Sequence, residues 1–339
     1  MERNVLYLNK KAMEEAGVLD MKAAIADLEK VYTLCARGDV INPGKCVLRW
    51  GKTTEDENEL GRLNAMPGYV GGEYDMAGIK WIGSGPQNYK KGLPRASVTV
   101  ILNDPDTKLP LCFADGTAVS VERTGASGGV AVANLAAKGA RKLLICGAGA
   151  QAPAQLEAAL IARPGIDTLY VYDIRPESAK RLAELAETRY KGLRAVPVDD
   201  PEDAARDADV IICVTLASQP FIRGAWLKKG CLVMNMSDYE VDRDCVKRAD
   251  KVVVDFWENI KHRMISTVAL MWKDGEFRDE EIHAEIGEIV SGKKPGREQE
   301  DEIIYYNAVG AGILDIALTT RCYRFAEKHG IGITLPFWE

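Results

Sequence analysis

The sequence lacks any apolar run close to the roughly 18 residues that a membrane-spanning helix requires. The segment from Met1 to Leu8 has no apolar core of signal-peptide length. Long blocks of basic residues are also absent, and the formal net charge is -6. These absences argue against membranes and nucleic acids as partners, so we expect a cytoplasmic protein with neither.

Signals for disulfides and metal sites are absent as well. The eight cysteines form no C-x-x-C pair, and some lie in apolar runs such as Leu143–Cys146. We interpret them as reduced, buried hydrophobic residues in a reducing compartment. The three histidines, His262, His283 and His329, do not have the spacing of metal ligands. We therefore expect no metal site.

The first part of the chain predicts a small α+β domain. With 339 residues, of which 47% are hydrophobic and 28% charged, the chain is typical of a globular protein with two domains. Helical spacing of apolar residues predicts a helix, and extended runs between turn signals predict strands. The predicted helix is Met21–Arg37, and the predicted strands are Cys46–Trp50, Ala77–Gly83 and Ser97–Leu102.

From about residue 118 the pattern changes to alternating helices and strands. The strands are apolar throughout, which is typical of parallel strands buried on both faces. We predict helices at Ala118–Lys138, Ala150–Arg163 and Glu177–Tyr190, and strands at Lys142–Cys146, Thr168–Tyr172, Val210–Val214, Leu232–Asn235 and Lys251–Asp255. This alternation predicts an α/β fold, a Rossmann doubly wound parallel sheet over residues 121–310. A last helical pattern over Asp301–His329 ends at Gly330.

A glycine-rich turn after the strand Lys142–Cys146 predicts dinucleotide binding. The segment Gly147–Ala152 fits G-x-G-x-x-A, with a strand before it and a helix after it. The next strand ends at Asp173, where a carboxylate would accept hydrogen bonds from ribose hydroxyls and repel a 2′-phosphate. NAD(H) is therefore favoured, although the nearby Arg175 leaves NADP(H) open. The alternative is a glycine turn that binds another ligand or none.

Further short motifs occur in order along the chain. They are Met66–Tyr69 (MPGY), Gly78–Trp81 (GIKW), Pro86 with Asn88, Gly92–Pro94 (GLP), Asp115–Thr117 (DGT), Glu122–Thr124 (ERT), Gly147–Gln151 (GAGAQ), Ser237–Asp238 and Val309–Gly310. Together they resemble the ornithine cyclodeaminase/mu-crystallin family of amino-acid and imine oxidoreductases, from about residue 5 to residue 330.

The resemblance implies an architecture and a reaction. Residues 1–120 with 311–339 would form a substrate-binding and dimerisation domain, and the protein would be a homodimer. Hydride would pass between the nicotinamide and the Cα of a small amino or imino acid substrate. The implied cofactor-binding residues are Thr124, Gly147, Gly149, Ala150, Gln151, Asp173 and Arg175, and Val309 and Gly310 would line the substrate site.

Three charged residues are the main candidates for chemistry, and each has a structural alternative. Lys80 lies in an apolar run, where burying an unpaired ammonium is costly. The resemblance implies that it binds a substrate carboxylate or carbonyl. The alternative is that it reaches water from an edge strand. Arg123 can grip the α-carboxylate in bidentate fashion, or form a surface salt bridge. Asp238 follows a buried strand at its carboxyl end and can accept an amine proton, or cap a helix.

Two departures from the family pattern bear on the substrate. Lys45 stands where we expect an arginine, and Arg95 stands where ornithine cyclodeaminases carry a small hydroxyl residue. Added cations suit a substrate with an extra carboxylate, and the segment resembles the N-(2-amino-2-carboxyethyl)glutamate dehydrogenase branch. Arg95 can equally face solvent.

Two other functions stay open from the sequence. An ornithine cyclodeaminase-type lyase would release ammonia from ornithine with no net change in NADH. A non-catalytic binding protein, as in mu-crystallins, would be indifferent to the Asp238→Asn substitution.

Overall fold

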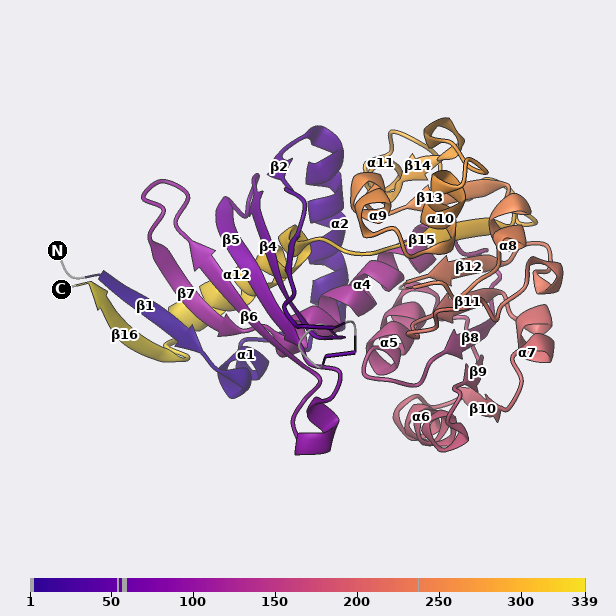
Figure 1. Cartoon of the computed structure of the whole chain (residues 1–339), viewed down its shortest axis with the longest axis horizontal. Coiled ribbons are helices and arrows are strands. Elements are labelled where there is room, and N and C mark those ends of the chain that lie inside the picture. The colour runs from indigo at the N-terminus through magenta and orange to yellow at the C-terminus, as the bar shows by residue number, and fades with distance from the viewer. Residues whose placement is uncertain (1–2, 54, 57–59, 237, 339) are drawn as a thin grey trace. The chain divides into compact units, whose positions relative to one another are not determined.

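The computed structural model describes residues 3–53, 55–56, 60–236 and 238–338. The chain divides into two compact units, which are coloured along the chain in Figure 1. Unit 1 consists of Met1–Arg123 and Ala311–Glu339, and unit 2 of Thr124–Gly310. The sequence placed the corresponding boundaries after residues 120 and 310. The first boundary falls inside helix α4 (Thr117–Leu135).

Unit 1 is built on a mixed sheet with the order β16-β1-β7-β6-β5-β4-β2, in which β3 also pairs with β4. Among the described strands of this sheet, only β1 and β7 pair in parallel. The strands are β1 (Arg3–Leu8), β2 (Val40–Ile41), β3 (Cys46–Leu48), β4 (Arg62–Val70), β5 (Met76–Ser84), β6 (Ala96–Asn103), β7 (Pro110–Asp115) and β16 (Ile333–Trp338). The three predicted strands correspond to β3, β5 and β6.

Helices α1 (Lys10–Glu15), α2 (Met21–Arg37) and α12 (Gly312–His329) complete unit 1, with the 3-10 helix η1 (Asn88–Lys91). The predicted bounds of α2 are confirmed; it begins after Asp20, whose carboxylate accepts a hydrogen bond from Ala23 N at 2.9 Å. Helix α12 packs on β4, β5 and α2 (Figure 1). Its close approach requires glycine at Gly68, where a Cβ would lie 2.6 Å from the Ile313 side chain.

Unit 2 contains an eight-stranded sheet with the order β10-β9-β8-β11-β12-β15-β13-β14. The described pairs are all parallel. The strands are β8 (Lys142–Cys146), β9 (Thr168–Tyr172), β10 (Arg194–Val198), β11 (Val210–Cys213), β12 (Leu232–Asn235), β13 (Lys251–Val254), β14 (Ala284–Glu285) and β15 (Ile304–Asn307). The order of the first five strands is that of a Rossmann sheet, with its switch point between β8 and β11. The predicted doubly wound sheet is confirmed.

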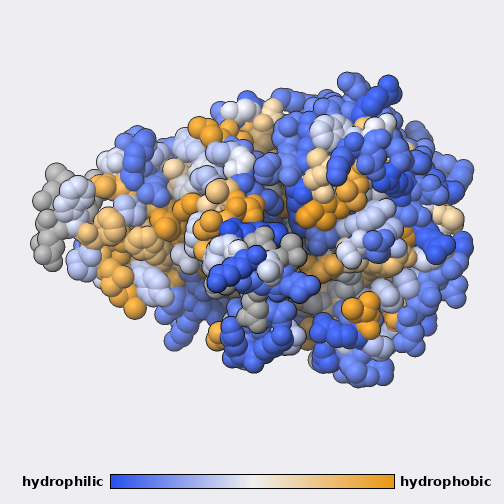
Figure 2. Space-filling view, viewed as in Figure 1, coloured by the Kyte–Doolittle hydropathy of each residue, from blue (hydrophilic) through white to orange (hydrophobic). Residues whose placement is uncertain are grey.

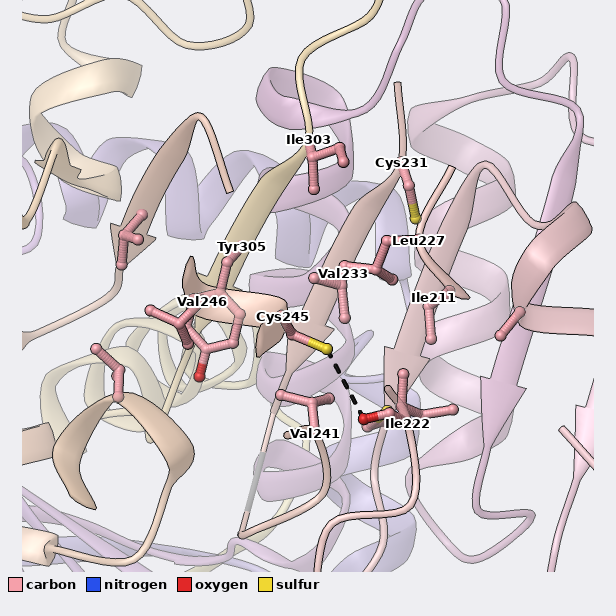
Figure 3. Close-up of a cluster of buried hydrophobic side chains, with 14 of the residues drawn as sticks. Ile211, Ile222, Leu227, Cys231, Val233, Val241, Cys245, Val246, Ile303 and Tyr305 are labelled. Carbon is pink, nitrogen blue, oxygen red and sulfur yellow. Dashed lines mark hydrogen bonds between the residues drawn. The ribbon is translucent and has the colours of Figure 1, made fainter. Parts of the chain in front are cut away.

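Helices alternate with these strands. They are α4, α5 (Ala152–Ala162), α6 (Pro176–Arg189), α7 (Glu202–Asp207), α8 (Arg243–Lys247), α9 (Trp257–Arg263), α10 (Thr267–Lys273) and α11 (Ile286–Val290), with 3-10 helices η2 (Gly224–Trp226) and η3 (Asp279–Glu281). Figure 3 shows part of the core that they form with the sheet, in which Cys231 and Cys245 are buried among aliphatic side chains. No cysteine forms a disulfide in the described part of the chain.

The predicted helix over Asp301–His329 is wrong in its first part. Residues Ile304–Asn307 form strand β15, which lies between β12 and β13 in the sheet. Its β-branched and aromatic residues favour a strand that is buried on both faces. The helix begins only at Gly312 and ends at Gly330 in the left-handed conformation.

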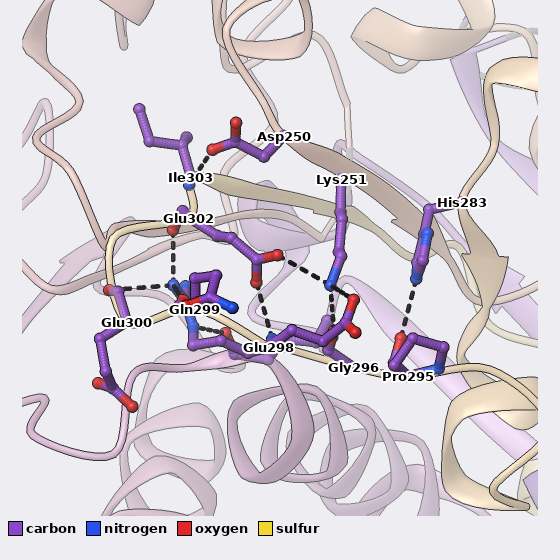
Figure 4. Close-up of polar contacts among 12 residues, drawn as sticks. Asp250, Lys251, His283, Pro295, Gly296, Glu298, Gln299, Glu300, Glu302 and Ile303 are labelled. Atoms are coloured by element: carbon purple, nitrogen blue, oxygen red, sulfur yellow. Dashed lines mark hydrogen bonds and ion pairs between the residues drawn. The ribbon is translucent and has the colours of Figure 1, made fainter.

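A cluster of charges anchors the segment before β15. Lys251 at the start of β13 donates hydrogen bonds to Glu298 and to the carbonyl of Gly296, and it forms an ion pair with Glu302 (Figure 4). Lys251, Glu298, Glu302 and Asp250 are each engaged within this cluster, whereas the Glu300 carboxylate accepts hydrogen bonds from Lys138 N. We assign this cluster a structural role.

Candidate functional site

The glycine turn after β8 has the backbone that a dinucleotide cradle requires. Gly147 has a φ of 97°, and a Cβ there would lie 2.9 Å from the Val214 carbonyl oxygen and from the Thr215 side chain. Only glycine fits this position without strain. A Cβ on Gly149, by contrast, would meet no atom within 4 Å. The turn therefore has one closed side and one open side.

Helix α5 starts at the open side of this turn. It begins at Ala152, two residues later than predicted, and Pro153 in its first turn has no N–H to leave unsatisfied. Ala150 is exposed, and the buried amide oxygen of Gln151 has no hydrogen-bond partner among the described residues. The N–H groups and the positive end of the helix dipole are available to an anion at this end.

Asp173 ties the end of β9 to the glycine turn. One carboxylate oxygen accepts a hydrogen bond from Ala148 N and the other from Arg175 N, each at 2.8 Å. The Arg175 side chain is largely exposed, with its Nε 3.6 Å from the carboxylate. A carboxylate can accept about four hydrogen bonds, so Asp173 retains acceptor capacity for ribose hydroxyls.

A cavity of about 490 Å³ lies beside the turn, entirely within unit 2. Its other wall is the segment that follows β11, residues 214–219. Besides this segment it is lined by Gly147, Gly149, Tyr172, Asp173, Ile174, Arg175 and Phe221. The size of the cavity, the glycine turn and the carboxylate of Asp173 fit a dinucleotide.

Thr124 lies in helix α4, behind this turn. Its carbonyl oxygen accepts a hydrogen bond from the Gln155 side chain at 2.9 Å, which joins α4 to α5. The two helices touch closely, because a Cβ on Gly125 would lie 2.8 Å from Ala154. Thr124 therefore helps to hold α5, whose first turn faces the cradle.

Lys80 is buried in unit 1 and forms two hydrogen bonds. It lies in β5, a central strand, and is 1% exposed. Its ammonium donates to Asp315 Oδ1 at 2.7 Å and to Ser120 Oγ at 2.8 Å. The edge-strand alternative for Lys80 is therefore excluded, since the ammonium does not reach water.

Arg123 shares the same carboxylate. Its Nε lies 3.2 Å from Asp315 Oδ2, and both side chains are buried. Two cations therefore face one carboxylate, which leaves a net positive charge in a buried place. A bound carboxylate would balance that charge, and the guanidinium can hold it in bidentate geometry.

The environment of Lys80 changes its acidity. Burial lowers the pKa of the Lys80 ammonium to about 8, with Arg123 acting in the same direction and Asp315 opposing both. An ammonium with a pKa near 8 can donate a proton, or a strong hydrogen bond, at physiological pH.

Two other predicted cations lie apart from this group in the described contacts. Arg95 is exposed, in a loop closed by a hydrogen bond from Gly85 N to the Arg95 carbonyl at 2.8 Å. Lys45 is partly buried just before β3.

Asp238 lies in the turn after β12, and the neighbouring Ser237 lies outside the described residues. The Asp238 carboxylate forms an ion pair with Arg263 at the end of α9, and both side chains are largely buried. Its carbonyl accepts a hydrogen bond from the Asn235 side chain at 2.9 Å. The carboxylate is therefore held in one position at the carboxyl ends of the parallel strands.

Val309 and Gly310 follow β15 and lie on Asp255. Their N–H groups donate to Asp255 Oδ2 at 2.9 and 2.6 Å, and Gly310 has a φ of 72°. Burial raises the pKa of Asp255 to about 7. Because these N–H groups are already engaged, the two residues can offer a substrate only their carbonyl groups or side chains.

The sequence reasoning missed several polar residues of the site. Asp315 is an acidic residue inside an apolar helical run, and that misplaced charge was a usable signal. The partner of Asp238 and the wall of the cavity carried no local signal. The missed residues are Ser120, Thr215, Glu240, Arg263 and Asp315.

No group of three or more His, Cys, Asp or Glu with metal-binding geometry occurs among the described residues. The same portion of the chain contains no helix suited to crossing a membrane.

Comparisons with known proteins agree with this geometry. The chain is 35% identical, over 100% of both chains, to N-((2S)-2-amino-2-carboxyethyl)-L-glutamate dehydrogenase of Staphylococcus aureus. Its structure resembles an archaeal alanine dehydrogenase dimer with bound NAD, with a TM-score of 0.90 and 32% identity over 99% of this chain and 100% of that one. It also resembles Thermococcus litoralis Delta(1)-pyrroline-2-carboxylate reductase in complex with NADH and L-proline, with a TM-score of 0.88 and 32% identity over 97% and 99% of the two chains.

The parallel sheet, the glycine turn and these relatives define an NAD(H)-dependent oxidoreductase. The model of the ornithine cyclodeaminase/mu-crystallin family matches residues 4–329. The chain belongs to that family, which confirms the resemblance found in its motifs.

Proposed function

We propose that this protein transfers hydride between NAD(H) and the Cα of an amino acid or its imine. The observation that carries the proposal is the buried pair of cations, Lys80 and Arg123, around one carboxylate, Asp315. A chain that also carries a dinucleotide cradle then has the two binding functions that the reaction needs. NAD(H), when bound, supplies the redox chemistry, and the protein positions and polarises the substrate.

Each candidate side chain has one role in this proposal. Arg123 binds the α-carboxylate of the substrate. Lys80 polarises the substituent on the reacting carbon, donating a hydrogen bond from its buried ammonium. Asp238 accepts the proton of the substrate amine or returns it to the product. Val309 and Gly310 border the substrate, and Thr124, Ala150, Gln151 and Arg175 border the cofactor.

We also propose a substrate with a second anionic group. Lys45 or Arg95 would bind that group, and an exposed arginine in a loop can reorient at small cost when a ligand arrives. The Staphylococcus aureus relative, which matches this chain over its full length, is named for a substrate that contains a glutamate moiety.

The test uses a panel of 2-oxo acids. Each acid is combined in turn with ammonia, alanine or glutamate as the amine, and the oxidation of NADH is measured by its absorbance. The strongest response is expected with glutamate, and Arg95→Ser should reduce that preference. NADH binding with no response across the panel would contradict the oxidoreductase proposal. Ammonia release from ornithine without net NADH change would instead indicate the lyase.

We propose that a second copy of this chain covers the open face of the unit 1 sheet. Ile79, Ile101 and Phe113 are paired across β5, β6 and β7, on the side opposite Lys80. Figure 2 shows apolar surface gathered toward β1 and β16, and a large exposed apolar patch favours association. One structural relative is a dimer.

Light scattering tests the dimer. Ile101→Arg should give a monomer, whereas Leu185→Arg, at an exposed apolar position on α6, should keep the wild-type mass. A wild-type monomer would contradict the proposal.

We propose a reducing, cytoplasmic location, supported by six cysteines that are buried as small hydrophobic side chains.

A further inference from the structure

Glu240 is a fully buried carboxylate that the proposed chemistry does not use. It follows the Asp238 turn and is 0% exposed. Its Oε1 accepts hydrogen bonds from Thr215 N and, at 2.8 Å, from Thr215 Oγ1, and its Oε2 accepts one from Asn235 Nδ2 at 2.8 Å. All three partners donate, so the ionised carboxylate satisfies them without a proton of its own.

The first of these contacts reaches the cofactor cavity. Thr215 lies in its 214–219 wall and faces the glycine turn, where a Cβ on Gly147 would meet the Thr215 methyl group at 2.9 Å. The main chain of Glu240 holds the residues that follow this segment, since its carbonyl accepts hydrogen bonds from Ile222 N and from Phe221 N, and Phe221 also lines the cavity. Glu240 therefore fastens the wall at Thr215 and just beyond its far end.

The second contact reaches the turn that carries Asp238. Asn235 Nδ2, which donates to Glu240, also donates to the Asp238 carbonyl at 2.9 Å. Asn235 cannot turn its amide over freely, because its Oδ1 accepts a hydrogen bond from Tyr305 OH at 3.0 Å. A chain of buried hydrogen bonds of this kind holds one arrangement only when every member is satisfied.

We propose that Glu240 is a positioning residue that holds the 214–219 wall of the cofactor cavity and the Asp238 turn in one joint arrangement, so that dinucleotide affinity and the placement of Asp238 depend on the same buried carboxylate. The inference rests on the proposed function only in taking this cavity as the dinucleotide site. The proposed oxidoreductase function does not require this role of Glu240.

The charge of Glu240 is sensitive to pH. Burial raises the pKa of the Glu240 carboxyl to about 7, and the nearby Asp238 carboxylate raises it further, while the three hydrogen bonds oppose both. The titratable groups near it include Tyr305, whose pKa burial keeps well above its ordinary value, and Cys213, whose pKa is raised by its hydrogen bond with Cys146 and by burial. Arg263 faces Asp238 rather than Glu240. Protonation on the acidic side of about pH 7 would therefore release one donor and loosen the wall.

The main test is Glu240→Gln. A glutamine must turn its NH₂ toward either Thr215 or Asn235, which both donate, so one hydrogen bond is lost. The dissociation constant of NADH, measured by fluorescence titration, should rise about tenfold at pH 8, and kcat should fall as well. In the wild type the affinity should weaken as pH falls below about 7, and in Glu240→Gln this pH dependence should disappear.

Thr215→Val is a milder variant that keeps the inference testable if Glu240→Gln fails to fold. It removes the hydroxyl, which donates to Glu240 and accepts from Ala217 N at 3.2 Å, and it leaves the Thr215 backbone N–H, so a roughly threefold weaker affinity is expected. The loss in the double variant should be smaller than the product of the two single losses, because both changes break the contact between Thr215 and Glu240. If the two effects multiply, the inference is wrong.

Glu285→Gln is the matched control. Glu285 is another carboxyl of unit 2 whose pKa burial raises, and it accepts a hydrogen bond from Trp257 N at 2.8 Å without lining the cavity. It should leave NADH affinity and its pH profile at wild-type values. A wild type that does not bind NADH overturns the cofactor proposal itself, whereas binding that is equal in wild type and Glu240→Gln overturns only the role of Glu240.

Discussion

Asp315 in helix α12 is the counterion of Lys80 in strand β5, although 235 positions separate the two residues in the sequence. The last helix of the chain therefore completes a site that the first part of the chain begins. Because Arg123 uses the other oxygen of the same carboxylate, the group carries one positive charge in excess when Lys80 is protonated. That charge is an electrostatic reason for a substrate carboxylate to bind here.

Removing the charge of Asp315 should destabilise unit 1. Asp315→Asn leaves two buried cations without a counterion, and breaking a buried pair in this way costs about 3–5 kcal/mol. Urea unfolding, followed by circular dichroism, measures the change. The double variant Lys80→Met/Asp315→Asn removes one of the two cations as well and should recover part of the loss. If Asp315→Asn is as stable as the wild type, the ion pair contributes nothing.

The lowered pKa of Lys80 predicts a pH dependence of activity. Lys80 is charged below about pH 8 and neutral above it, so turnover that needs its ammonium should fall as pH rises through 8. Lys80→Arg keeps its charge at all accessible pH values. The activity of Lys80→Arg should therefore not fall as pH rises through 8, although its maximal rate is expected to be lower. If the activity of Lys80→Arg falls above pH 8 as it does in the wild type, the titrating group is not Lys80.

The same shift has a consequence for stability with the opposite trend. A lysine whose pKa is lower in the folded than in the unfolded protein costs stability while both forms are protonated, below about pH 8. The cost is relieved as pH rises from 8 toward the unfolded value of about 10.4. Lys80→Met removes this contribution, which comparison of its unfolding curves at pH 7 and pH 10 with the wild type would reveal.

Arg123 should determine substrate affinity and leave cofactor affinity unchanged. Arg123→Met removes the guanidinium but retains a side chain of similar length, and losing a hydrogen-bonded charge contact costs about 1.5–3 kcal/mol. We expect KM for the amino or oxo acid to rise about 10- to 100-fold, with the dissociation constant of NADH unchanged. Steady-state kinetics and a fluorescence titration measure the two quantities separately. An equal loss of both would indicate misfolding.

Asp173 should control the choice between the two dinucleotides. Asp173→Asn removes the negative charge that repels a 2′-phosphate, and it also disturbs the hydrogen bonds to Ala148 N and Arg175 N. NADH should bind about tenfold more weakly, an effect of about 1.4 kcal/mol, while NADPH should bind more tightly, helped by the exposed Arg175. Competition titrations with both nucleotides test this, and a constant NADH preference would refute the assignment.

Five strands of the parallel sheet could be predicted from the sequence because each of them is a short apolar run, whereas the partly exposed β10 and the two-residue β14 were not predicted. Lys142–Cys146 and Thr168–Tyr172 have the predicted bounds, since strands buried on both faces need no partner-dependent pattern. Strand β15 was missed because its apolar residues lie close to those of α12. Residue propensities separate a short apolar strand from an adjacent apolar helix poorly when only Gly310 and Ala311 mark the boundary between them.

The candidate site was less predictable, because its contacts join distant segments. The motifs indicated Lys80, Arg123 and Asp238, but a motif gives no partner. Asp315 and Arg263 are 235 and 25 positions away from the residues that they pair with. Only the fold brings such pairs together, so the charge balance of the site was invisible in the sequence.

The role of Asp238 can be separated from its placement. Asp238→Asn removes the proton acceptor and should lower kcat about 10²- to 10⁴-fold, the usual contribution of a general acid or base, with NADH affinity unchanged. Arg263→Met keeps the acceptor but removes the ion pair that holds it. That variant should lose less activity than Asp238→Asn, since the carboxylate is still present but moves more freely. The helix-capping alternative for Asp238 is wrong, because Asp242 caps the next helix, α8. If Asp238 only held its turn in place, both variants would lose stability and retain kcat, and thermal unfolding beside the kinetics distinguishes the two cases.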